Sequence, residues 1–461
     1  MTLIIVIILL LSYALIATEN ITKVNKAAVA IFAGTVGWVL YICWGSDFVM
    51  SQHGSDFVDW LNGAVPTSTS VKHYIAQNIF LKYVGRAAEI VLFLLATMTI
   101  VEILNNNGCF DDIQMWLRTR KSRKFLWLLS AFTFVISANL DNLTTTVMML
   151  VMMHNMVTSR RQRLLYGSAV VLASNAGGAL TVIGDPTGLV LWNMNAVTAS
   201  NFSFSLLIPC LIAWILPTWW IGRSLPERIE LECQVMVYRG DKTRLNVWQR
   251  VVMLFVGIGG LWFIPTFHSI TKLSPFLGAL CVLSVLWIVN EIFNYKQMDV
   301  DKMIQRRIPR VLQYGVIQMM LFVMGIMLVL GVVQETGAIR WLARILDDMF
   351  HSVWLAGLLA GCVSSILDNF ATAMSFMSFH DVADGVYVAS DYFTSFVQNG
   401  PFWKIIAYSS ALGGSILTVG SMSGIALMKM ERVRVWWYFK NVGIVAFVGW
   451  IVGLAALFFI V

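Results

Sequence analysis

Three aspartates lie in the middle of strongly apolar segments, where an ionisable side chain is costly to bury. Asp141 and Asp368 are each followed by an asparagine, and Asp185 follows a glycine. Inside a bilayer such a charge must be compensated or neutralised, so carboxylates at that depth mark ion and proton pathways by default. The three carboxylates are therefore the first candidates for chemistry.

The side chains near these aspartates offer oxygen, and no Lys or Arg occurs in their motifs to hold an organic anion. Oxygen-rich sites that include a carboxylate suit a hard cation such as Na⁺. Na⁺ and a proton would compete for the same carboxylate oxygens, which is the simplest physical basis for exchange. The candidate residues of this Na⁺ and proton site are Asp141, Asn142, Thr144, Thr145, Asn175, Asp185, Thr187, Ser364, Asp368, Asn369, Thr372 and Ser421.

Two further carboxylates lie in the segment 86–104, which is expected to span the membrane. Glu102 is a candidate for coupling, although it would also suit a place at the cytoplasmic interface. Glu89 is expected near the outer interface and is a weaker candidate.

The aspartate at position 141 lies within an apolar run of about 35 residues, too long for one span of about 20 and short for two spans with a turn. Basic residues flank both ends of the run, and positive charge marks the cytoplasmic side. We therefore expect a re-entrant hairpin that turns at Asp141. Residues 352–379 repeat the pattern around Asp368.

Each expected hairpin is followed by a long apolar segment that glycines interrupt, Leu164–Asn195 in the first case and Phe402–Met430 in the second. Glycine is a poor helix residue, and proline removes a backbone donor. Both segments are therefore predicted to be discontinuous helices. The interruptions are Gly177-Gly178 with Gly184-Asp185-Pro186, and Gly413-Gly414 with Gly420-Ser421.

The composition predicts an all-α polytopic membrane protein, since 58% of the 461 residues are hydrophobic and 12% are charged. We expect about ten spans plus two hairpins. The net charge of +7 comes mostly from short basic loops that set topology, including the one around Lys23 and Lys26, so no nucleic acid partner is expected. The expected straight spans are 3–17, 27–44, 86–104, 202–221, 247–264, 275–289, 311–333 and 441–460.

An odd number of expected crossings separates the two hairpins, so the second must enter the membrane from the opposite side. The halves would then be inverted repeats, an architecture found in many secondary transporters. The expected domains are 1–85 (N-terminal spans and extracytoplasmic loop, a scaffold), 86–222 (first repeat), 223–246 (cytoplasmic linker) and 247–461 (second repeat).

Structural roles remain open for the same residues. Asp and Asn favour turns, so the aspartates at 141 and 368 would suit capped hairpin turns. Asp185 would suit a cap of the second half-helix. The Gly-Gly pairs would suit close helix packing.

The combined motifs resemble the NhaD family of Na⁺/H⁺ antiporters, which belongs to the ion transporter superfamily with the citrate and dicarboxylate symporters. The resemblance covers about residues 80–440. It maps the family's polar motif onto Asp141, Asn142, Asn175, Asp185, Thr187, Ser364 and Asp368. The motifs that carry it are Leu140-Asp141-Asn142-Leu143-Thr144-Thr145, Asn175-Ala176-Gly177-Gly178, Gly184-Asp185-Pro186-Thr187, Asp368-Asn369 and Gly413-Gly414-Ser415.

The resemblance implies Na⁺(Li⁺)/H⁺ exchange in the bacterial inner membrane, with no enzymatic activity and no cofactor. It also implies a homodimer with scaffold helices at the dimer contact, and a mobile part that moves like an elevator. One departure is that Gly188 follows Thr187, where the family often has a second threonine. The alternative is a cation-coupled di- or tricarboxylate symporter on the same scaffold, against which aspartates at both hairpin tips argue, because they repel an anion.

Overall fold

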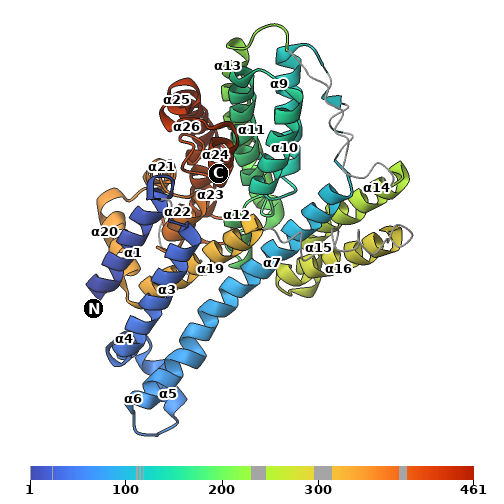
Figure 1. The fold of residues 1–461 in the computed structure, drawn as a ribbon. Helices are drawn as coiled ribbons and strands as arrows, with labels where there is room; N and C mark the ends of the chain where they lie inside the picture. The colour runs from blue at the N-terminus through green and yellow to red at the C-terminus, as the bar shows by residue number, and fades with distance from the viewer. Residues whose placement is uncertain are drawn as a thin grey trace.

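The computed structural model describes residues 2–22, 24–110, 113, 116–117, 119–229, 245–294, 314–383 and 392–461. Within these ranges the chain is helical and forms no strand (Figure 1), which confirms the all-α class. Most of the expected linker at 223–246 lies outside the described residues, as does part of the expected outer loop at 380–402.

The N-terminal helices lead into one long rod. The helices α6, η1 and α7 follow each other without a break, so that Ser68–Asn106 is a single helix of 39 residues. It begins well before the expected start at residue 86, because no proline interrupts it. The N-terminal elements are α1 (Thr2–Ala17), α2 (Glu19–Thr22), α3 (Lys26–Cys43), α4 (Gly45–Gln52), α5 (Gly54–Leu61), α6 (Ser68–Tyr74), η1 (Ile75–Phe80) and α7 (Leu81–Asn106).

The first helix–turn–helix pair forms where the first hairpin is expected. The helix α9 ends at Ser137, and α10 begins at Asn142 with Asp141 as its N-cap. The following segment is broken at residues 181–185. The elements are α9 (Ser122–Ser137), α10 (Asn142–Met156), α11 (Arg160–Leu180), α12 (Pro186–Asn193) and α13 (Ala199–Arg223).

The second pair has the same form, with α21 ending at Ser364 and Asp368 capping α22. The segment after it is broken between Gly413 and Met422. The elements of this half are α14 (Val247–Leu254), η2 (Phe255–Gly259), α15 (Gly260–Thr271), α16 (Pro275–Asn294), α19 (Tyr314–Glu335), α20 (Ala338–Phe350), α21 (Val353–Ser364), α22 (Asn369–Met377), η4 (Phe393–Phe396), α23 (Pro401–Gly413), α24 (Met422–Glu431), α25 (Val435–Tyr438), η5 (Phe439–Gly443) and α26 (Ile444–Phe458).

The Gly177-Gly178 pair does not break its helix, contrary to expectation, because α11 continues to Leu180. Its glycines serve packing instead. A Cβ on Gly177 would lie 2.2 Å from the carbonyl oxygen of Phe134, so α9 crosses α11 with backbone against backbone. In the second half the helix α23 does end at Gly413, where a Cβ would lie 2.3 Å from the carbonyl oxygen of Gly361.

Each helix pair packs on its own broken helix, and the two sets then meet. The helices α9 and α10 contact α11, while α21 and α22 contact α23. The sets join where α10 and α11 contact α24, and where α11 contacts α23. Apart from these sets, α3 lies along α19, and α7 contacts α16 and α19 (Figure 1).

Seven helices in the described chain are long and apolar enough to cross a membrane. They are Lys26–Cys43, Ser68–Asn106, Ala199–Arg223, Val247–Thr271, Pro275–Asn294, Ile317–Glu335 and Val435–Phe458. The other expected spans are the short helix α1 and the two broken helices, so the total of about ten stays a prediction.

We predict that Gly177→Ala destabilises the protein, because the added methyl group must separate α9 from α11. Overpacking of this kind costs about 1–3 kcal/mol. The matched control is Gly85→Ala in α7, where nothing lies within 4 Å of the added Cβ and alanine favours the helix. Thermal unfolding of the purified variants in detergent measures the effect. Equal melting temperatures for the two variants would contradict the close crossing.

Candidate functional site

Asp185 joins the tips of the two helix pairs. Its Oδ2 atom accepts hydrogen bonds from the Asn142 side-chain amide at 3.1 Å and from the Asn369 side-chain amide at 3.0 Å. Its Oδ1 atom accepts the backbone N–H of Thr187 at 2.9 Å, because Asp185 is the N-cap of α12. The residue is 2% exposed. One carboxylate therefore holds together three segments that are far apart in sequence.

Asp141 caps α10 and keeps one oxygen free of normal hydrogen bonds. Its Oδ2 atom accepts the backbone N–H of Thr144 at 2.9 Å and the Thr144 hydroxyl at 3.1 Å. The Oδ1 atom is buried and accepts no hydrogen bond of normal geometry from the described residues. Asp141 thus caps α10, but the cap uses only one of its two carboxylate oxygens, Oδ2.

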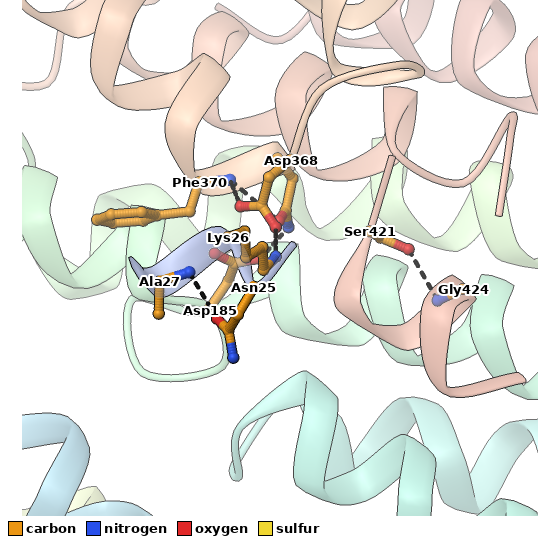
Figure 2. Close-up of polar contacts among 9 residues, drawn as sticks. Asn25, Lys26, Ala27, Asp185, Asp368, Phe370, Ser421 and Gly424 are labelled. Atoms are coloured by element: carbon orange, nitrogen blue, oxygen red, sulfur yellow. Dashed lines mark hydrogen bonds and ion pairs between the residues drawn. The ribbon is translucent and has the colours of Figure 1, made fainter. Parts of the chain in front are cut away.

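Asp368 is paired with Lys26, a residue expected in a basic loop. The Lys26 Nζ atom lies 2.6 Å from Asp368 Oδ2, and the Phe370 backbone N–H donates to Asp368 Oδ1 at 3.1 Å. The two residues are 7% and 4% exposed. Figure 2 shows Lys26 reaching to Asp368 from the start of α3, which Asn25 caps by accepting the N–H of Ala27.

The presence of Lys26 corrects the expectation that no positive charge lies at the motifs. The motifs themselves contain none, but the fold brings in a lysine from 342 positions away. No local pattern marks Lys26 as a site residue. Its only signal in the sequence is its place directly before an apolar helix. A loop lysine that sets the topology occupies the same kind of place.

The cluster still carries more negative than positive charge. Asp185 lies close enough to both Asp141 and Asp368 for their carboxylates to repel one another. The Lys26 ammonium group pairs with Asp368 alone, and within the described ranges no other Lys or Arg forms an ion pair with any of the three aspartates. Such an arrangement favours a bound cation or proton and disfavours an anion.

Asn175 connects the first broken helix to the second. Its side-chain amide donates to the Ser415 hydroxyl at 2.8 Å and to the Ser421 hydroxyl at 3.1 Å. Ser421 also caps α24 by accepting the Gly424 N–H, as Figure 2 shows. Ser421 thus takes the place in α24 that Asp185 takes in α12.

Several buried oxygens on the two helix pairs and the two broken helices make no hydrogen bond within the described structure. They belong to an amide and to hydroxyl groups, which are ligands of hard cations. No three His, Cys, Asp or Glu side chains in the described residues converge on a metal position, so a cation here would need these neutral oxygens as well. They are Asn175 Oδ1 and the side-chain oxygens of Thr145, Thr372, Thr418 and Ser423.

Three other expected residues have different places. The Ser364 hydroxyl donates to the Ser410 carbonyl at 2.5 Å and so fixes the end of α21 against α23. Glu102 accepts a bond from Asn106 on its own helix, and Glu89 accepts the Asn193 amide at 2.7 Å. Neither glutamate makes a contact with the aspartate cluster in the part of the chain described.

Comparisons with known proteins match most of the chain to ion transporters. A family model described as citrate transporter matches residues 1–380. Sodium/proton antiporter 2 of Arabidopsis thaliana is 30% identical over 400 residues, which are 86% of this chain and 90% of that protein. The Na⁺/H⁺ antiporter NhaD of Vibrio cholerae is 24% identical over 452 residues, 91% of this chain and 83% of that protein.

The chain belongs to the NhaD-type antiporter family of the ion transporter superfamily. A further member, sodium/proton antiporter 1 of Arabidopsis thaliana, is 34% identical over 379 residues, 81% of this chain. The chain spans only 62% of the length of that relative. In this NhaD-type chain the family match includes Lys26 and all three aspartates, and it ends before Ser415 and Ser421.

We predict that Asn142→Ala and Asn369→Ala each lower the stability of the protein. Each removes one of the two amides that donate to the buried Asp185 carboxylate, and a hydrogen bond to a charged group contributes about 1.5–3 kcal/mol. The control is Asn441→Ala, since the Asn441 amide donates only to the Trp437 carbonyl on the protein surface. Melting temperatures of the purified variants give the comparison. If both variants have the same melting temperature as the control, Asp185 does not hold the tips together.

Proposed function

We propose that this chain is a secondary active transporter that exchanges Na⁺ or Li⁺ for H⁺ across the membrane. The observation that carries the proposal is the buried cluster of three carboxylates, in which Lys26 is the one cation found among the described residues. The relatives from Arabidopsis thaliana and Vibrio cholerae, all named as sodium/proton antiporters, support it.

In the proposed exchange, Na⁺ binds at the carboxylates and at the neutral oxygens beside them. Asp141 Oδ1 and Asn175 Oδ1 are the first ligands we assign, because both are buried acceptors that make no normal hydrogen bond. The hydroxyls of Thr145 and Thr372 add further oxygens. When Na⁺ leaves, a proton takes its place on a carboxylate, so each substrate compensates the charge that the other leaves behind.

Matching contacts in the two halves support our proposal of inverted repeats with re-entrant hairpins. The backbone N–H of Asn142 donates to the Gly184 carbonyl at 3.2 Å, and that of Asn369 donates to the Gly420 carbonyl at 3.1 Å. In both halves the aspartate before the asparagine caps the next helix. Two such units facing each other suit alternating access, which we propose to be elevator-like.

We also retain the expected domains as proposals, namely 1–85, 86–222, 223–246 and 247–461. The protein would be a multi-pass protein of the bacterial inner membrane and a homodimer with scaffold helices at the contact. Large apolar side chains are exposed on α14–α16, among them Phe255 and Trp262, and such a surface suits lipid or a second subunit.

The alternative of a carboxylate symporter finds support in the family model, which is described as citrate transporter. An anion at this site would face the repulsion of Asp141 and Asp185, and the Lys26 ammonium is already bonded to Asp368. The charges therefore favour cation exchange.

We predict that Asp141→Asn and Asp368→Asn each reduce exchange to background while the protein still reaches the membrane. Each change keeps the shape of the side chain but removes a group that takes up a proton or Na⁺. Asp185→Asn is expected to be nearly as severe. Glu89→Gln, which lies outside the cluster, is the mild control. The assay follows the pH gradient in everted vesicles on addition of Na⁺, Li⁺, K⁺ or citrate.

Near wild-type exchange in both Asp141→Asn and Asp368→Asn would show that these aspartates serve only as caps, and would turn attention to Glu102. Citrate-dependent uptake without proton movement driven by Na⁺ would establish the alternative function.

A further inference from the structure

Lys26 is the only positively charged side chain in the described ranges that contacts an aspartate of the cluster. Its Nζ atom lies 2.6 Å from Asp368 Oδ2, at the short end for a bond between charged groups. The same atom lies 4.4 Å from the centre of the Phe322 ring, a distance at which a cation is attracted to the ring face. The ammonium group thus has a defined position beside one carboxylate oxygen.

The two partners come from different parts of the fold. Lys26 is the first residue of α3, which packs along α19 and α1, whereas Asp368 caps α22, which packs on α21 and α23. Phe322 lies in α19, so α3 and α19 together hold the ammonium group. The ion pair therefore fastens the N-terminal helices to the tip that carries Asp368 (Figure 2).

We propose that Lys26 is the resident counter-ion of Asp368, and that Na⁺ or a proton must displace Lys26 before the site is loaded. This inference rests on the proposed Na⁺/H⁺ exchange. Na⁺ cannot use the oxygen at Oδ2 while an ammonium group lies against it, because like charges repel at that distance. A proton on Asp368 removes the negative charge that holds Lys26. Both substrates thus break the same ion pair.

Two consequences follow for exchange. In the unloaded site Lys26 compensates Asp368, so the empty carboxylate is not left as an isolated buried charge. The apparent affinity for Na⁺ then includes the cost of separating Lys26 from Asp368. Lys26 sets how tightly the site binds Na⁺ without being a Na⁺ ligand itself.

The test is the apparent KM for Na⁺ of Lys26→Met and Lys26→Gln in everted vesicles at alkaline pH, where few protons compete. Methionine keeps the length of the side chain against Phe322, and glutamine keeps a hydrogen-bond donor for Asp368. Both lack the charge, so KM should fall by about tenfold or more, since an ion pair in a buried site exceeds the energy of one tenfold step. Lys26→Arg keeps the charge, so its KM should not fall below that of the wild type.

The matched control is Lys404→Met. Lys404 is 4% exposed in α23 and makes no ion pair within the described residues, so its removal should leave KM unchanged. If the wild type shows no Na⁺/H⁺ exchange, the proposed function itself fails. The wild type alone reveals that failure, without any comparison of variants.

When the wild type does exchange Na⁺ for H⁺, the inference is overturned if KM is unchanged in Lys26→Met or Lys26→Gln, provided that the variant reaches the membrane. A fall in maximal rate alone, with KM unchanged, assigns Lys26 a structural role and also overturns it. The inference fails as well if neither neutral variant reaches the membrane while Lys26→Arg does so normally, because the charge is then needed for folding.

Discussion

Three carboxylates buried among apolar helices are the constraint on which the rest of this structure depends. A buried charge needs donors or a counter-charge, since its hydration is lost. The chain supplies backbone N–H groups by placing each aspartate at a helix N-terminus. It adds two asparagine amides at Asp185 and one ammonium group at Asp368. The first helix break carries the carboxylate of Asp185 at the start of α12, whereas the second carries the hydroxyl of Ser421 at the start of α24.

The two halves use the same local geometry but contribute different chemistry. Both have a capping aspartate at the tip, a close glycine crossing and a backbone bond from the asparagine to a glycine carbonyl. The first half adds Asp185 and Asn175, whereas the second half offers the hydroxyls of Ser415 and Ser421 to the Asn175 amide. Of the two breaks, the first therefore contributes a carboxylate, and the second contributes neutral oxygens.

The tips and breaks could be predicted from sequence because their causes are local. An Asp-Asn pair in an apolar run, or Gly-Asp-Pro within one, changes the backbone at that place. The packing role of Gly177 could not be predicted, since glycine does not end a helix that is packed on both sides. The start of the long helix at Ser68 could not be predicted either, because no proline interrupts that helix. Lys26 could not be predicted, because its contact with Asp368 depends on how α3 and α22 meet and not on any spacing along the chain.

We propose competition of Na⁺ and protons for the same buried carboxylates. It is tested most directly by adding Na⁺ to the purified protein in weakly buffered detergent solution and measuring the protons released. We expect proton release that saturates with Na⁺ in the wild type and is absent from a variant with both Asp141→Asn and Asp368→Asn. Saturable Na⁺ binding with no proton release from the wild type would contradict it.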